Sequence, residues 1–163
     1  MKGLADGALA QVRPGQFFAA PSGEDNSLAI LVKHVGGNLL SRWTGFLTSD
    51  GEKPGRNRDA EFEITAADTH QMLMGRWESG WAALFSALEP LTDGDLEKTV
   101  TIRGEPLSIL QAINRQLTHY SYHVGQIVYV AKHYAGGSWR SLSIPRGKSA
   151  QFNLNPANYV KPA

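Results

Sequence analysis

The sequence predicts an all-α protein built as a four-helix bundle, and three observations support this prediction. Four segments carry apolar residues at helical spacing. In the last of them the spacings alternate between three and four residues, which is typical of helices that pack side by side. The connection over residues 49–64 is rich in glycine, proline and charge, and it is long enough to cross the bundle. We expect a single domain over residues 1–163.

The first expected helix covers residues 2–12 and is broken by Pro14 and Gly15. It is too short to cover its share of a bundle. Either the start of the chain is truncated, or the C-terminal tail or a partner subunit covers the remaining apolar surface. The second helix is expected over residues 25–47, with one apolar face formed by Leu28, Leu31, Val35, Leu39 and Phe46.

The third helix is expected to follow Thr65 as its N-cap, with Asp68 three residues later, and to end at Pro90. Its apolar positions are Leu73, Trp77, Trp81, Leu84 and Leu88. The β-branched residues of segment 97–106 predict a small strand or an extended loop before the next helix.

The fourth helix is expected to begin near Pro106, a favourable residue in a first turn, and to end at Gly136 and Gly137. Its apolar or aromatic positions are Leu110, Ile113, Leu117, Tyr120, Val124, Ile127, Ala131 and Tyr134. Residues 136–163 lack periodicity and are expected to form an ordered C-terminal extension. The side chains available to attach this extension to the helices are Trp139, Leu142, Ile144 and Phe152.

Composition excludes several classes of protein. The formal net charge is +1, so no basic field of the kind that binds nucleic acid is expected. No apolar run is long enough to span a membrane, and a cytoplasmic location is expected. The chain has no cysteine, which excludes disulfides and a thiolate nucleophile from the protein. Histidine, aspartate and glutamate remain as the strong metal ligands.

Two histidines four residues apart, His119 and His123, form the clearest pattern for metal binding. Side chains at positions i and i+4 of a helix point in the same direction, one turn apart. A third ligand must then come from another helix, and His34 in the middle of the second helix is the best candidate. Three neutral imidazoles around one cavity suit Zn, Ni, Fe or Mn. The spacing alone also fits ordinary polar residues at the edge of a bundle.

Three separated blocks occur in order along the chain: "LVKHVGGNLLSRWTGFLTSDGEKPGRNRDAEFE", "LTHYSYHVGQIVYVAKH" and "SWRSLSIPRGKSAQFN". Together they resemble the DUF1572 group of the DinB/YfiT-like metalloenzyme superfamily, over residues 2–153. The resemblance implies a four-helix bundle with up-down-down-up topology, a long crossover after the second helix and a metal site at His34, His119 and His123. The first helix begins later here than is usual in that family.

The resemblance implies a metal-dependent enzyme that acts on a small molecule. The first expectation is a thiol-dependent S-transferase, which uses a low-molecular-weight thiol as cosubstrate and acts on a small electrophile. The second is a metal-dependent hydrolase, in which the same site activates water. The third is a non-catalytic stress-response or binding module. Homodimers are common in the superfamily, so a homodimer is also expected.

Residues near the three histidines are candidates to orient the ligands or to bind substrate: Asn38, Arg42, Arg56, Arg58, Glu61, Glu63 and His70. A thiol that carries carboxylates needs basic partners, which the arginines can supply. A hydrolase needs a carboxylate as general base, which one of the two glutamates can supply. The alternatives are arginines paired with nearby acidic residues, a packing role for Asn38 and a position at the edge of the core for His70.

Overall fold

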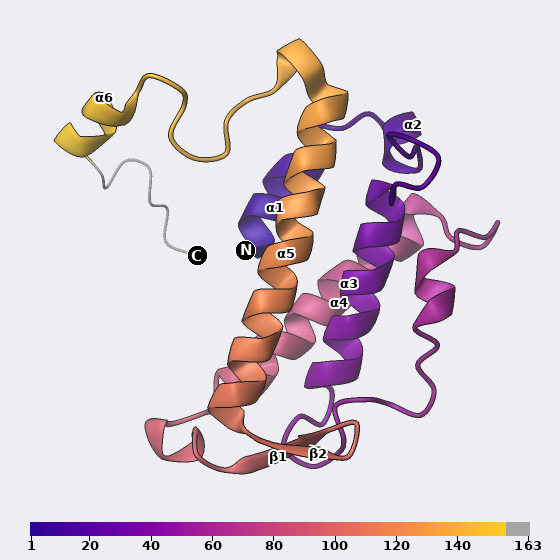
Figure 1. The fold of residues 1–163 in the computed structure, drawn as a ribbon, viewed down its shortest axis with the longest axis vertical. Helices are drawn as coiled ribbons and strands as arrows, with labels where there is room; N and C mark the ends of the chain where they lie inside the picture. Colours follow the sequence, from indigo (N-terminus) through magenta and orange to yellow (C-terminus); the bar gives the residue numbers. More distant parts are fainter. Residues whose placement is uncertain (156–163) are drawn as a thin grey trace.

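A computed structural model of the protein describes residues 1–155, and over this range the chain is mostly helical (Figure 1). The prediction of a mostly helical chain is confirmed, with the addition of a two-stranded antiparallel sheet. No helix within residues 1–155 is long and apolar enough to cross a membrane.

The α-helices are α1 (Lys2–Leu9), α2 (Pro14–Phe17), α3 (Leu28–Trp43), α4 (His70–Leu88), α5 (Ile109–Ala135) and α6 (Ser149–Leu154). The 3-10 helices are η1 (Asp59–Phe62), η2 (Asp93–Asp95) and η3 (Gly136–Ser138), and the strands are β1 (Thr99–Ile102) and β2 (Glu105–Ser108).

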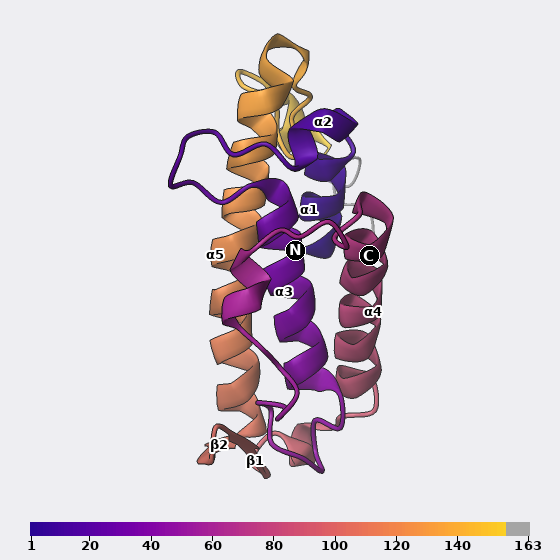
Figure 2. The same ribbon diagram turned by 90° about the vertical axis from the view of Figure 1, so that its right-hand side faces the viewer.

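Helices α3 and α4 pack closely and run in the same direction, beside α5 (Figure 2). Two glycines make the close approach possible. A Cβ atom at Gly80 would lie 2.8 Å from Cβ of Leu39 and 3.1 Å from the carbonyl oxygen of Gly36. A Cβ atom at Gly36 would lie 3.4 Å from the backbone of Arg76. The long connection between α3 and α4 returns the chain to the end at which α3 began, as a crossover requires.

The third helix begins later than the sequence predicts. Thr65 is not its N-cap, because the Thr65 backbone N–H and hydroxyl both donate to the carboxylate of Asp68 in a turn that precedes the helix. Thr69 is the N-cap instead, and its hydroxyl accepts a hydrogen bond from the backbone N–H of Met72. The pattern of Thr followed by Asp three residues later therefore marks a turn here and not a helix start.

The fourth helix also begins later than the sequence predicts. Pro106 lies in β2 opposite Thr101 of β1, and not in the first turn of the helix. Ser108 caps α5 by accepting a hydrogen bond from the Gln111 backbone N–H, while the Gln111 side chain accepts from the Ser108 backbone N–H. Of the two alternatives for residues 97–106, a small strand or an extended loop, the structure has the strand: the segment contains β1, the turn of the hairpin and the first two residues of β2. The helix ends as predicted, where Gly136 adopts a positive φ of 53°.

The apolar positions predicted for the fourth helix are buried only in its second half. Tyr120, Val124, Ile127 and Ala131 are buried, whereas Leu110 and Leu117 are exposed. Helix α1 is too short to cover the beginning of α5, so a groove of about 270 Å³ stays open there. Apolar and aromatic side chains dominate its lining: Trp43, Trp81, Leu84, Phe85, Leu88, Ile113, Leu117 and Tyr120.

The segment after α5 attaches to the helices through its first residues. Trp139 and Leu142 pack against the core, and the Gln11 side chain bonds the backbone of Arg140 at both N–H and C=O. Ile144 is not part of the core, and α6 lies apart from the other helices in Figure 1. The residues next to α5 are therefore held against the helices, while residues 156–163 of the expected C-terminal extension lie outside the described range.

Candidate metal centre

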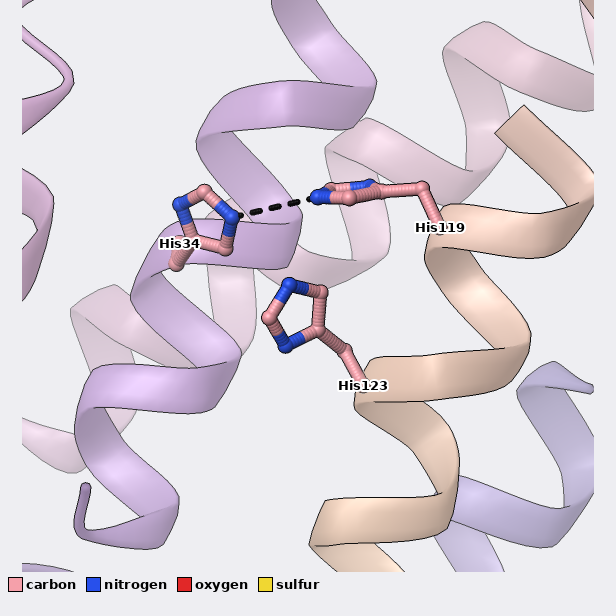
Figure 3. Close-up of side chains that lie close together, drawn as sticks. All are labelled: His34, His119 and His123. Carbon is pink, nitrogen blue, oxygen red and sulfur yellow. Dashed lines mark hydrogen bonds between the residues drawn. The ribbon is translucent and has the colours of Figure 1, made fainter. Parts of the chain in front are cut away.

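Three histidine rings converge between α3 and α5 (Figure 3). His34 comes from the middle of α3, and His119 and His123 come from successive turns of α5. Nε2 of His34 lies 3.3 Å from Nε2 of His119. The three rings each offer one nitrogen, and all three nitrogens lie within 4.8 Å of one another. His34 and His123 are buried and His119 is half-buried, so the cluster lies inside the protein with one side accessible.

The spacing of these nitrogens suits a divalent cation. Zinc binds imidazole nitrogens at about 2.0–2.1 Å in a tetrahedral arrangement, which places two ligand nitrogens about 3.4 Å apart. The pair His34 and His119 is already at this distance. The other separations reach up to 4.8 Å, so His123 must move by about an ångström to complete the set. A rotation of one side chain is enough for a shift of this size.

A buried carboxylate orients His34. The Nδ1 atom of His34 donates to Oε2 of Glu61 across 2.9 Å, which leaves the lone pair on Nε2 free to bind a cation. The guanidinium of Arg56 holds the same carboxylate through two hydrogen bonds of 2.9 and 2.8 Å. Gly37 provides the space, because a Cβ atom there would overlap Oε1 of Glu61. The chain of contacts from Arg56 through Glu61 to His34 therefore fixes the ring.

An amide orients His123 in the same way. Nδ1 of His123 lies 2.7 Å from Oε1 of Gln126, one turn further along α5. A carbonyl oxygen only accepts hydrogen bonds, so Nδ1 carries the proton and Nε2 keeps its lone pair. Figure 3 shows the rings of His34, His119 and His123 pointing toward one another. Nδ1 of His119 is buried and has no hydrogen-bond partner among residues 1–155.

The pKa shifts within the cluster favour the protonation states that a cation requires. The pKa of His119 is lowered to about 3, first by burial and then by the neighbouring His123 and His34. Burial also lowers the pKa of His123. Burial alone would raise the pKa of Glu61, but the hydrogen bonds from His34 and Arg56 outweigh it and lower that pKa. At neutral pH the site therefore combines the neutral imidazoles of His119 and His123, which can bind a metal, with the ionised carboxylate of Glu61.

A basic cavity of about 200 Å³ opens beside the cluster. Two of the three histidines, His34 and His119, belong to its lining, together with the amide side chains of Asn38 and Gln116. The rest of the lining is five arginines: Arg42, Arg56, Arg58, Arg103 and Arg115. A ligand in this cavity would therefore touch both positive charge and the imidazoles.

Two of the arginines expected to bind substrate are engaged within the protein. Arg42 donates to the carbonyl of Gly51 and to the carboxylate of Glu52. Arg56 is bound to Glu61 and, at 3.4 Å, to Glu52. Both guanidiniums are nearly completely buried, so they form the base of the cavity.

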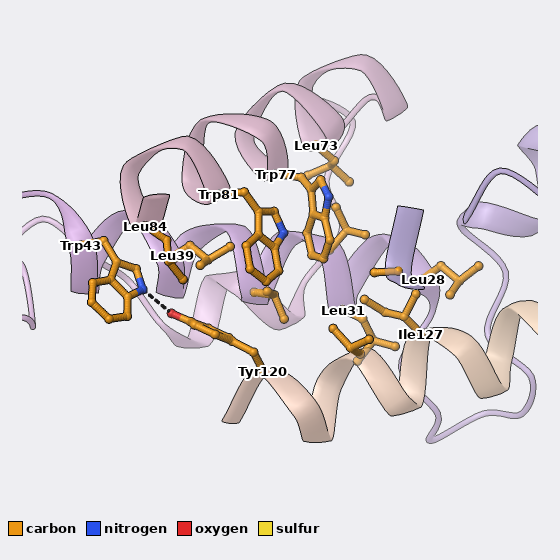
Figure 4. Packing of buried hydrophobic residues seen from close by; sticks show 14 of the residues in the cluster. Leu28, Leu31, Leu39, Trp43, Leu73, Trp77, Trp81, Leu84, Tyr120 and Ile127 are labelled. Atoms are coloured by element: carbon orange, nitrogen blue, oxygen red, sulfur yellow. Dashed lines mark hydrogen bonds between the residues drawn. The ribbon is translucent and has the colours of Figure 1, made fainter. Parts of the chain in front are cut away.

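The other candidates have partners elsewhere than at the three histidines. Asn38 accepts a hydrogen bond of 3.0 Å from the hydroxyl of Tyr120, and not from His34. Tyr120 in turn accepts one from the indole of Trp43, which ties α5 to α3 within the core (Figure 4). Glu63 is exposed and outside the cavity. His70 starts α4 and packs edge-on against Phe17, away from the other histidines.

Several residues of the site were missed by reasoning from the sequence: Gly37, Arg103, Arg115, Gln116 and Gln126. Gln126 follows His123 by one turn, a spacing that could have identified it. Gly37 could have been noted as one of two adjacent glycines within a helix. Gln116 and Arg115 precede His119 by three and four residues, so the same helical spacing could have identified them. Arg103 gave no local signal, because the fold brings it to the cavity from the hairpin.

Comparison with known proteins identifies a family. Residues 1–148 match the protein family described as "Protein of unknown function (DUF1572)". No curated protein matches the chain, and no solved structure matches it. The geometry of the site must therefore support any argument about function.

Proposed function

The chain belongs to the DUF1572 protein family, and from this premise we propose that it is a metal-dependent enzyme in which His34, His119 and His123 bind one divalent cation, Zn, Ni, Fe or Mn. We further propose that its fold is a DinB-like four-helix bundle with up-down-down-up topology. The parallel packing of α3 and α4, joined by the long crossover, supports this topology. The single observation that carries the metal site is the convergence of three imidazole nitrogens, with His34 oriented by the buried Glu61 and His123 by the half-buried Gln126.

The reaction we propose is transfer of a small thiol to an electrophilic small molecule. A cation bound by three neutral imidazoles would keep its positive charge and lower the pKa of a thiol beside it. In the balanced reaction the thiol loses its proton to solvent, a sulfur–carbon bond forms, and the leaving group departs with the electron pair of its bond to carbon. The chain has no cysteine, which agrees with a thiol supplied from outside the protein.

The surroundings of the cluster favour thiol transfer over hydrolysis. A hydrolase needs a carboxylate free to accept a proton from water. Glu61 is the carboxylate nearest to the cluster, but His34 and Arg56 already occupy it. None of the described residues that line the basic cavity is acidic.

A purely structural metal is disfavoured by the number of ligands. Structural zinc sites are normally closed by four protein ligands. Within residues 1–155 the cluster offers three, and two of these line an accessible cavity. The open side of the site is therefore available to a small molecule.

Elemental analysis tests the metal site. Protein purified without a histidine tag is compared with the His119→Ala/His123→Ala double variant and with His133→Ala, which removes an exposed histidine outside the cluster. We expect about one equivalent of Zn, Ni, Fe or Mn in the parent protein and in His133→Ala, and none in the double variant. Absence of metal from all three proteins, before and after titration with these ions, would refute the metal site.

A thiol-transfer assay then tests the reaction. The metal-loaded protein is mixed with a small thiol and the electrophile monobromobimane, and formation of the fluorescent thioether is followed. We expect a rate above the uncatalysed reaction that depends on the protein, and loss of this increase in the double variant. Turnover of ester substrates by the same protein, without thiol transfer, would instead assign it as a hydrolase.

A further inference from the structure

The basic cavity beside the histidines brings together positive charge from four separate parts of the chain. Arg42 comes from α3, Arg56 and Arg58 from the crossover, Arg103 from the hairpin and Arg115 from α5. The described lining contains no carboxylate. Like charges gathered around a small cavity repel one another, so this arrangement is unfavourable for an empty protein and favourable for one that binds an anion.

Internal ion pairs neutralise the base of this cavity more completely than its rim. Glu52 accepts hydrogen bonds from three of the arginines, Arg42, Arg56 and Arg103, and Glu61 is bound by Arg56. These two carboxylates face five guanidiniums. The remaining positive charge lies at the rim, where an incoming anion meets it first.

The rim arginines have weak or partial contacts within the protein. Arg58 lies 3.8 Å from the carboxylate of Asp59, and Arg115 lies 4.0 Å from that of Glu105. Both pairs are exposed, so they contribute little to stability. Arg103 contacts Glu52 through Nε alone, at 2.9 Å. The side chains of Arg58, Arg103 and Arg115 are 54%, 52% and 43% exposed, and each has N–H groups available for a ligand.

The backbone of Arg103 adopts an unusual conformation that keeps this residue at the cavity. Arg103 and Gly104 form the two-residue turn of the hairpin, with φ values of 57° and 75°. Such a turn favours Asn or Gly at its first position, and arginine is strained there. Asp50 accepts hydrogen bonds from both backbone N–H groups and holds the turn against the crossover. A hydrogen bond from the backbone N–H of Glu52, together with those from Gly104 and Arg103, lowers the pKa of Asp50 to about 2, so the carboxylate stays ionised.

We propose that Arg58, Arg103 and Arg115 form an anion-binding subsite that holds the carboxylate end of a small thiol while its sulfur lies against His34 and His119. The identity of the ligand as a thiol rests on the function proposed above, whereas the binding of an anion does not. Guanidinium groups bind carboxylates through paired N–H groups. A molecule with a carboxylate at one end and a thiol at the other matches the two kinds of lining residue in one cavity.

Two matched probes test the contributions of the carboxylate end and the thiol end of the ligand separately. Succinate carries two carboxylates, and mercaptosuccinate differs from it only by a thiol. Binding of each to the purified full-length protein is measured by isothermal titration calorimetry. We expect succinate to bind, and mercaptosuccinate to bind more tightly. In His123→Ala, which removes a metal ligand that does not line the cavity, we expect succinate binding to persist and the advantage of the thiol to disappear.

Variants of the rim test the arginines themselves. Loss of a charged hydrogen-bond partner in Arg103→Gly or in Arg115→Gln should weaken succinate binding by about tenfold or more. Arg103→Gly is also a stability control, because glycine is favoured at a positive φ and should leave the melting temperature unchanged or raised. The control Arg140→Gln removes an exposed guanidinium outside the cavity and should bind like the parent.

The outcomes distinguish this proposal from the proposed function. Succinate binding that is absent, or equal in the parent and in both rim variants, would overturn the subsite. Binding of inorganic phosphate but not succinate would overturn its assignment to a carboxylate. Succinate binding that depends on Arg103 and Arg115, without any advantage of mercaptosuccinate in the metal-loaded protein, would confirm the subsite and count against thiol transfer.

Discussion

At the scale of single residues, the two partners of Glu61 explain why it is buried. An ionised carboxylate in the interior is costly unless it is paired and hydrogen-bonded. Arg56 pairs with its charge through two hydrogen bonds, and His34 donates a third. The same contacts keep the proton of His34 on Nδ1, so the carboxylate leaves Nε2 of His34 available to the cluster.

The first prediction concerns this carboxylate. In Glu61→Gln the amide keeps the shape of the side chain but loses the charge that orients His34, so we expect metal affinity to fall by about 10- to 100-fold. Competition with a chromophoric chelator measures the affinity. Glu63→Gln is the matched control, since Glu63 is exposed on the same crossover and should bind metal like the parent. Equal losses in the two variants would show that Glu61 has no specific role.

At the scale of secondary-structure elements, the contact between α3 and α4 depends on residues without side chains. The two helices make the most extensive contact in the molecule, and Gly36 and Gly80 allow it. Because α3 carries His34, its position against α4 also sets where this ligand lies relative to α5. Helix packing and the geometry of the histidine cluster are therefore linked through one helix.

The second prediction compares two glycines of α4. In Gly80→Ala the new methyl group would meet Leu39 and the backbone of α3, so we expect a loss of about 1–3 kcal/mol in the free energy of unfolding. Gly75→Ala is the control on the same helix. Nothing lies within 4 Å of a Cβ atom there, so the higher helix propensity of alanine should add about 1 kcal/mol to the stability. Urea denaturation monitored by circular dichroism measures both values, and similar changes in the two variants would contradict the close packing.

At the scale of the whole molecule, the histidine cluster links α3, α5 and the crossover. Helix α5 contributes two of the rings, α3 contributes the third, and the crossover contributes the carboxylate behind it. The protonation state of this cluster should therefore affect the stability of the entire chain and not only the site.

The third prediction is a loss of stability in mild acid. The pKa of His119 is about 3 in the folded protein and 6.5 in its unperturbed state, so the unfolded chain binds a proton more readily. Stability contributed by the neutral ring is complete above pH 6.5 and is lost as the pH falls from 6.5 toward 3. Denaturation with urea at a series of pH values, on protein treated with a chelator, should show this decline. His119→Gln cannot be protonated and should show a shallower one. Identical pH profiles would refute the assignment.

The sequence alone determined the features that depend on local periodicity. The helical segments, the end of α5 at Gly136 and the adjacency of His119 and His123 all follow from residues a few positions apart. The predicted helix starts at Thr65 and Pro106 were wrong. Thr and Pro are common at the start of a helix, but here Thr65 lies in a turn and Pro106 lies in a strand. The true N-caps, Thr69 and Ser108, are identified by the hydrogen bonds that the structure shows.

Tertiary structure decided how the site is completed. His34 is 85 residues away from His119 in the sequence and 27 residues away from Glu61, and only the packing of α3 against α5 and the crossover brings them into contact. Arg103 and Arg115 reach the same cavity from the hairpin and from α5 for the same reason. A pattern in sequence reports neighbours along one element, whereas a binding site requires elements to meet, and that depends on how their buried faces fit together.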